Sequence, residues 1–129
     1  MSTRSASFDL PPRAPSIQAA RHLVLELLRV WDAPQDRSDA ALLVTELVAN
    51  VVDHVGGDAA LTLELTASED WLRIGVLDGS AVPPVVQELS RERPRGRGLL
   101  MVQAIAERWG CEEHEGGKRV WFELAPAAG

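Results

Sequence analysis

The chain has 129 residues, of which 46% are apolar and 25% charged, and its formal net charge of -6 disfavours direct nucleic-acid binding, because phosphate backbones favour a basic surface. This length predicts one domain with one core, and no apolar run approaches the roughly 20 residues of a membrane span. Because residues 1–10 also lack the apolar core of a signal peptide, we expect a cytoplasmic protein. A single cysteine, Cys111, excludes an internal disulfide or a cysteine metal cluster, so we expect a reduced thiol.

The first part of the chain predicts one strand and two helices. Residues 5–10 alternate as a short strand, and prolines then end it. A helix with an apolar stripe follows from about Ser16 to Trp31. A second helix, capped by Asp36 or Ser38, continues to about residue 55, where a pair of glycines stops it.

The second part of the chain predicts two hairpins separated by a loop and a helix. In chain order these are strands 61–66 and 72–76, a loop over 80–97, a helix over Leu99–Trp109, and strands 111–115 and 119–124 joined through Gly116-Gly117. This order predicts an α+β fold, a two-layer α/β sandwich with helices on one face of a mostly antiparallel sheet.

One stripe of the second predicted helix is polar. At 100° per residue, Asn50 lies about 40° from Glu46, Asp53 lies about 20° to the other side, and His54 lies about 80° away. Apolar residues fill the rest of the helix. This combination of carboxylate, amide and imidazole suits a magnesium-nucleotide site, and an ordinary solvated helix face is the alternative.

Two glycine motifs follow this helix. Asp78-Gly79 ends an apolar strand, where it suits either a ligand contact or a plain turn, since Asp-Gly is a common turn dipeptide. Gly96-Arg97-Gly98-Leu99 opens the third helix, whose first N–H groups favour phosphate. Each motif alone is weak, and their order along the chain is more specific.

The order of these motifs resembles the GHKL (Bergerat-fold, histidine-kinase-like) ATPase superfamily. Within it, the chain is most similar to the anti-sigma-factor serine/threonine kinases. In those kinases a Glu-x-x-x-Asn helix, an Asp-Gly turn and a Gly-x-Gly helix start follow one another in the same order. The resemblance covers nearly the whole chain and implies a single ATP-binding domain over residues 1–129.

The resemblance implies ATP and Mg²⁺ as cofactors. Asn50 would be the magnesium ligand, and Glu46 would be the general base. Asp78 would accept a hydrogen bond from the adenine amino group while Gly79 lets the backbone approach the ring. Gly96, Arg97, Gly98 and Leu99 would bind phosphate, and the loop over about 80–97 would be the ATP lid.

The resemblance also implies partners. The chain would phosphorylate a small anti-sigma-factor antagonist and sequester a sigma factor, with Arg21 contacting the protein substrate. A solvated helix arginine is the alternative for Arg21, and the lid arginines are either solvated charges or partner contacts. Similar proteins tend to be homodimers, so the sequence is compatible with either a homodimer or a monomer.

Two departures from the superfamily pattern bear on activity. The usual Asp-x-Gly-x-Gly is reduced to Asp78-Gly79-Ser80-Ala81, and Arg119 is expected where a threonine would assist adenine binding. Both departures favour a second hypothesis, a non-catalytic binding module that keeps the fold and acts by sequestration. The intact Glu46 and Asn50 oppose it.

Overall fold

The computed structural model of the chain describes residues 3–54, 60–79 and 98–127. Its five strands form one sheet in the order β1-β2-β3-β5-β4, with every pair antiparallel. The elements are β1 (Arg4–Leu10), α1 (Pro15–Val30), α2 (Arg37–His54), β2 (Leu61–Ala67), β3 (Leu72–Asp78), α4 (Gly98–Ile105), β4 (Arg108–His114) and β5 (Gly117–Leu124).

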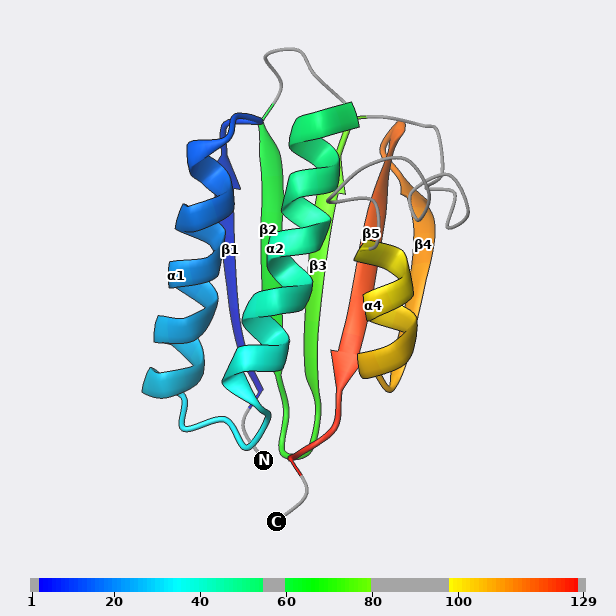
Figure 1. Cartoon of the computed structure of the whole chain (residues 1–129). Helices are drawn as coiled ribbons and strands as arrows, with labels where there is room; N and C mark the ends of the chain where they lie inside the picture. Colours follow the sequence, from blue (N-terminus) through cyan, green and yellow to red (C-terminus); the bar gives the residue numbers. More distant parts are fainter. Residues whose placement is uncertain (1–2, 55–59, 80–97, 128–129) are drawn as a thin grey trace.

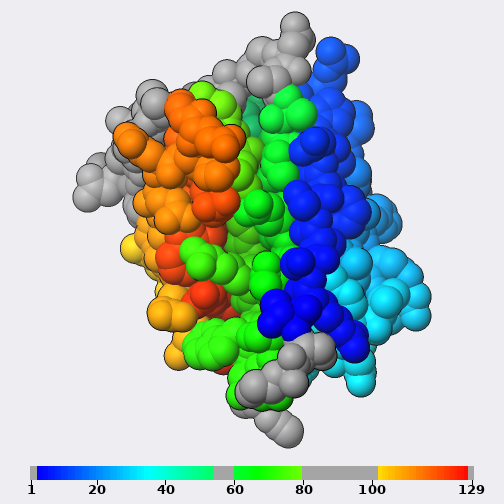
Figure 2. Space-filling model, turned by 180° about the vertical axis from the view of Figure 1, so that it is seen from behind, coloured from blue at the N-terminus to red at the C-terminus, as the bar shows by residue number. Residues whose placement is uncertain are grey.

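The molecule has two layers. Helices α1, α2 and α4 lie side by side on one face of the sheet (Figure 1). The opposite face, seen from behind in Figure 2, carries no helix among the described residues. The predicted α+β sandwich with helices on one face is therefore confirmed, and every strand pair proves antiparallel.

Helix α2 forms because its start is capped and one side is continuously apolar. The backbone N–H of Asp39 donates to Asp36 Oδ1 at 2.9 Å, so Asp36 is the cap rather than Ser38. The buried side chains of α2 belong to one core with the inward residues of the sheet. The members of this core on α2 are Ala40, Leu43, Val44, Leu47, Val48 and Val51.

The predicted third helix is too long at its C-terminal end. Helix α4 stops at Ile105, and Arg108 to Gly110 belong to β4. Trp109 pairs with Phe122 of β5 and packs against the core. Its apolar side chain continues the helical spacing of α4 in the sequence, but strand pairing determines the structure here.

The last hairpin turns one residue earlier than predicted. Glu115 and Gly116 form the turn, with φ angles of 49° and 83°, and Gly117 is already the first residue of β5. Positive φ at both central residues is the requirement of a two-residue hairpin turn whose twist matches its strands. The other predicted boundaries lie within two residues of the observed ones.

We expect Glu115→Asn to raise the free energy of unfolding by about 0.5–1 kcal/mol, because Asn tolerates the left-handed region better than Glu does. Chemical denaturation followed by circular dichroism measures this change. The matched control is Glu113→Asn, two residues earlier in β4, which lowers stability or leaves it unchanged because Asn disfavours strands. An equal gain in both variants would contradict the turn assignment.

Candidate nucleotide site

Several predicted site residues meet at one end of the molecule. Strand β3 ends at Asp78 and β5 begins beside it at Gly117, while the C-terminal half of α2 reaches the same end (Figure 1). Helix α2 contacts both α4 and β3. The fold therefore brings the polar stripe of α2 and the Asp78-Gly79 motif to the same end of the sandwich.

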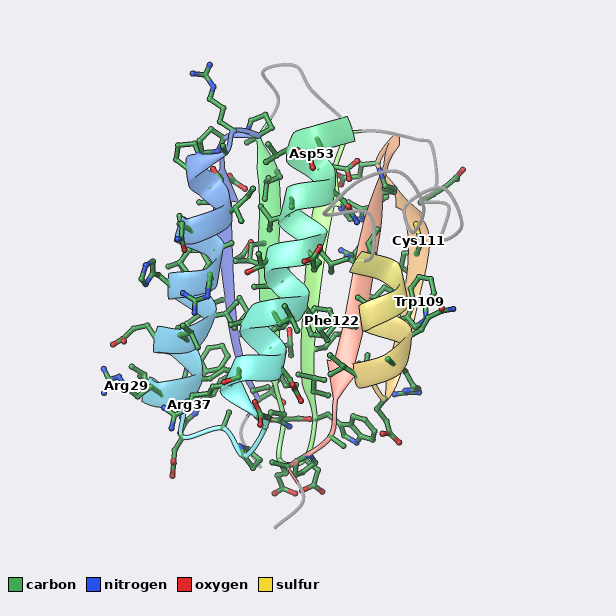
Figure 3. The ribbon with its side chains drawn as sticks, in the orientation of Figure 1. Arg29, Arg37, Asp53, Trp109, Cys111 and Phe122 are labelled. Carbon is green, nitrogen blue, oxygen red and sulfur yellow. The ribbon has the colours of Figure 1, made fainter. Side chains whose placement is uncertain are left out.

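The polar stripe of α2 is not a fully solvated face. Glu46 and Asn50 are half-buried, whereas Asp53, one turn further on, is exposed (Figure 3). Buried Leu47 and Ala49 hold this part of the helix against its neighbours. Intermediate burial of a carboxylate and an amide one turn apart is the arrangement that a bound ligand would complete.

The part of the chain that the structure describes contains no group of three or more acidic, histidine or cysteine side chains able to hold a metal ion by themselves. Mg²⁺ commonly binds through one or two protein oxygens together with substrate phosphates and water. The neutral side-chain oxygen of Asn50 fits this mode, so the residues present are compatible with Mg²⁺-ATP and less so with a standalone metal centre.

Among the predicted ligands whose burial the structure describes, Asp78 is the most deeply buried. Its side chain is 2% exposed, and Lys118 Nζ lies 3.0 Å from Asp78 Oδ1. The next residue, Gly79, is exposed, and a Cβ added there would meet no described atom within 4 Å. A buried carboxylate therefore lies beside a glycine whose Cβ position is clear of every described atom.

A close backbone contact fixes the two strands at this point. A Cβ at Gly117 would lie 2.0 Å from the carbonyl oxygen of Asp78, so only glycine fits. This contact sets Lys118, the next residue, directly opposite Asp78 in the strand register. The pairing of β3 with β5 therefore places Asp78 and Lys118 next to each other, and their contact is not a chance contact between flexible surface side chains.

The expectation that Arg119 lies at the adenine end is wrong, because Lys118 takes that place. Val120 and Phe122 face the core, so alternation along β5 puts Lys118 on the helix side and Arg119 on the other. Sequence reasoning missed Lys118, although the apolar alternation of β5 was the signal that could have identified it.

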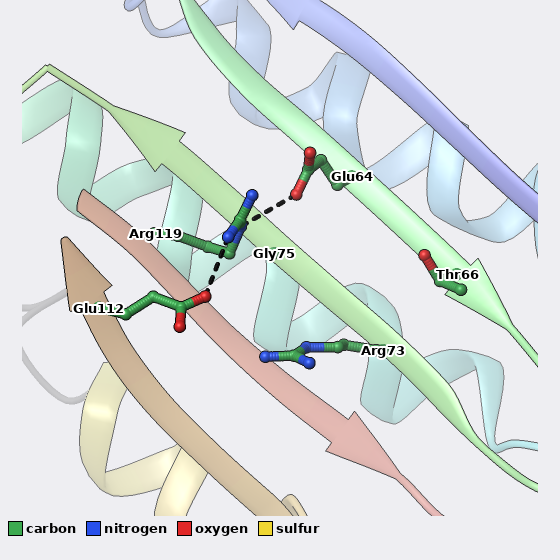
Figure 4. Close-up of a pocket in the computed structure, with 6 residues that line it drawn as sticks. All are labelled: Glu64, Thr66, Arg73, Gly75, Glu112 and Arg119. Carbon is green, nitrogen blue, oxygen red and sulfur yellow. Dashed lines mark hydrogen bonds and ion pairs between the residues drawn. The ribbon is translucent and has the colours of Figure 1, made fainter. Parts of the chain in front are cut away.

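Arg119 belongs to the face of the sheet that the helices leave open. It crosses β3 over Gly75 and donates to Glu64 at 3.1 Å and to Glu112 at 2.9 Å (Figure 4). These hydrogen bonds, that to Glu112 foremost, raise the pKa of Arg119. The pocket drawn there is lined by Glu64, Thr66, Arg73, Gly75, Glu112 and Arg119, and it lies on the far side of the sheet from α2.

The remaining predicted residues are placed only in part. Gly98 and Leu99 are the first two residues of α4, where free N–H groups occur. Gly96 and Arg97, together with the predicted lid over 80–97, lie outside the described residues, as does the side chain of His54. Arg21 is exposed on α1, which packs against α2 and lies on the opposite side of it from α4 (Figure 1).

Cys111 on β4 is a free cysteine. Partial burial raises the pKa of its thiol, and the nearby charge of Lys118 offsets only part of this effect. The shift favours the protonated, unreactive form of the thiol.

Comparison with known proteins agrees with this geometry. Residues 10–124 match the family model of the histidine kinase-like ATPase domain. The catalytic domain of the histidine kinase ThkA, in a nucleotide-free form, has the same fold, with a TM-score of 0.55 and 20% identity over 95% of this chain and 96% of that one. An uncharacterised protein of Streptomyces coelicolor is 34% identical over 85 residues, which are 64% of this chain and 81% of that protein.

Fold and family together define an ATP-binding domain of the Bergerat type. The chain belongs to the histidine kinase-like ATPase domain family, whose members bind ATP with Mg²⁺. Among the residues described, no helix is long and apolar enough to cross a membrane.

We expect two glycine substitutions at this site to differ sharply. Gly79→Ala should change the free energy of unfolding by less than about 1 kcal/mol, because a Cβ there meets no described atom. Gly117→Ala should cost more than about 2 kcal/mol, because its Cβ would overlap the Asp78 carbonyl. Thermal and urea unfolding of the two variants measures the difference, and equal stabilities would contradict the close strand contact.

Proposed function

We propose that the chain is a cytoplasmic serine/threonine protein kinase of the anti-sigma type. It would use Mg²⁺-ATP to phosphorylate a small anti-sigma-factor antagonist, and it would also sequester a sigma factor. The observation that carries the proposal is the half-buried Glu46 and Asn50, one turn apart on α2, in a chain of the histidine kinase-like ATPase family. Phosphoryl transfer needs a metal ligand and a base, and these two residues supply both.

Each site residue then has one task. Asn50 would hold Mg²⁺, which when bound neutralises charge on the phosphate oxygens. Glu46 would accept the proton of the attacking serine hydroxyl. Asp78 would accept a hydrogen bond from the adenine amino group, with Gly79 leaving room for the ring. Little covalent work falls to the protein, because such transfer depends on positioning and charge stabilisation.

The partner surface would lie on the helical layer. Arg21 is exposed on α1, and a guanidinium suits contact with a carboxylate of a protein substrate. We propose that Arg21 helps to hold the antagonist while its serine is phosphorylated. A homodimer would bring two such surfaces into one assembly.

A second candidate is a binding module without phosphoryl transfer. One observation favours it: the Asp78 carboxylate, the proposed adenine reader, is engaged by Lys118 at 3.0 Å. If this contact kept adenine from Asp78, ATP would not bind and the domain would act by sequestration alone. The two candidates differ in whether ATP binds and whether its γ-phosphoryl group moves to a partner.

Asn50→Ala should abolish most of the Mg²⁺-dependent part of ATP binding, because it removes the metal-ligating oxygen. Glu46→Gln should keep binding and lower the rate of serine phosphorylation at least 100-fold, because the base is lost. Calorimetric titration of ATP with and without Mg²⁺ measures the first effect. Transfer of labelled γ-phosphate to recombinant anti-sigma-factor antagonists measures the second.

Helix stability provides an internal control for these two variants. Alanine is a better helix former than asparagine, so Asn50→Ala should not weaken α2 by helix propensity, and thermal unfolding of the variant checks that its fold is kept. Unchanged, magnesium-dependent ATP binding by Asn50→Ala would refute the metal assignment. ATP binding without transfer to any antagonist would favour the sequestration module.

Arg21→Ala should raise the KM for the protein substrate at least tenfold and leave ATP affinity unchanged, because α1 is separated from β3 and α4 by α2 (Figure 1). Arg29→Ala is the matched control, since Arg29 is also exposed on α1 and pairs within the helix with Glu26. Steady-state kinetics with varied antagonist measure both variants. Equal effects of the two substitutions would assign the loss to general surface charge.

A further inference from the structure

The contact between Lys118 and Asp78 adds a hydrogen-bond donor to the proposed binding site for the purine base of the nucleotide. The Lys118 side chain is only 12% exposed, and its Nζ lies 3.0 Å from a carboxylate that is 2% exposed. Both side chains are on the helix side of the sheet, at the ends of neighbouring strands β3 and β5. An acceptor and a donor therefore lie side by side next to Gly79, whose Cβ position no described atom approaches within 4 Å.

The two common types of purine differ in the order of donor and acceptor on one edge. A 6-aminopurine such as adenine presents an amino donor at position 6 and an acceptor at N1. A 6-oxopurine such as hypoxanthine presents an acceptor at position 6 and an N1–H donor. A carboxylate accepts only, whereas an ammonium group donates only and has three N–H bonds.

We propose that Lys118 is a specificity-determining residue that lets this base site accept 6-oxopurine as well as 6-aminopurine nucleoside triphosphates. This inference rests on the proposed function, in which Asp78 reads the base. With a 6-oxopurine whose ring is turned over about this edge relative to adenine, N1–H donates to Asp78 and Lys118 donates to the oxygen at position 6. With adenine, the amino group donates to Asp78 and Lys118 donates to N1.

The reason for the broadened specificity is electrostatic. A carboxylate alone would repel the oxygen of a 6-oxopurine, and a site that leaves such a group unpaired rejects the ligand strongly. The ammonium of Lys118 removes that repulsion. The close approach of Gly117 to the Asp78 carbonyl keeps the ammonium at this place, and Arg119 cannot substitute because it lies on the opposite face.

The test compares ATP with inosine triphosphate, whose bases differ only at this edge. Each is titrated calorimetrically, with Mg²⁺, into the wild type, Lys118→Met, Lys118→Gln and Arg119→Met. We expect the wild type to bind the two nucleotides within about tenfold of each other. Lys118→Met should lower the affinity for inosine triphosphate relative to ATP by tenfold or more, since the donor is lost.

The other two variants are controls. Lys118→Gln keeps an N–H donor and should keep binding of inosine triphosphate, and Arg119→Met should leave the affinity ratio unchanged. The ratio is measured within one preparation, so a partly unfolded variant does not distort it. Lys118→Leu, which also lacks a donor, serves where Lys118→Met does not fold.

The outcomes separate this inference from the proposed function. Two results overturn the role of Lys118 and leave the ATP site intact. In the first, the wild type binds ATP but not inosine triphosphate; in the second, Lys118→Met leaves the ratio of the two affinities unchanged. A folded wild type that binds neither nucleotide overturns both the role of Lys118 and the proposed kinase.

Discussion

The packing of α2 onto the centre of the sheet is the contact on which the rest of the structure depends. Its buried leucines and valines share one core with β2, β3 and β5, and each such side chain contributes about 1.5–3 kcal/mol on burial. Because residues of a helix advance by 100°, fixing the apolar side also fixes Glu46 and Asn50. The polar stripe therefore has one possible position relative to β3.

The two faces of β5 have different tasks. On the helix side, Lys118 forms a nearly buried pair with Asp78, where removing one partner has a large cost. On the open side, Arg119 joins Glu64 and Glu112, and Arg73 lies 4.0 Å above the ring of Trp121. Partly exposed ion pairs contribute at most about 1 kcal/mol each, so the open face adds little to stability.

Much of the fold could be predicted from the sequence because its patterns are local. The alternation of Leu61 to Leu65 and Leu72 to Val76 identified a hairpin, and the two candidate caps Asp36 and Ser38 identified the start of α2 to within two residues. The end of α4 could not be predicted, because Trp109 fits both a helical stripe and a strand. Pairing with Phe122, a contact distant in sequence, decides between them.

The sequence identified individual residues of the candidate site, but it did not show which of them lie in contact. The stripe of Glu46 and Asn50 follows from helical spacing, and Asp78 follows from its place at a strand end. The assignment of Arg119 failed because a shift of one residue along a strand reverses the face. Which residue lies opposite Asp78 depends on the register of β3 against β5. These strands are distant in the chain, so this register cannot be determined from local sequence patterns.

The most direct test of this account is a map of amide chemical-shift changes in the labelled protein as a non-hydrolysable ATP analogue and Mg²⁺ are added. The account predicts that the largest changes fall on Asn50, on Asp78-Gly79 and on Lys118, at one end of the helix-covered face. Residues of the open face, such as Arg73 and Trp121, should change little. Changes concentrated on the open face, or none at saturating nucleotide, would contradict it.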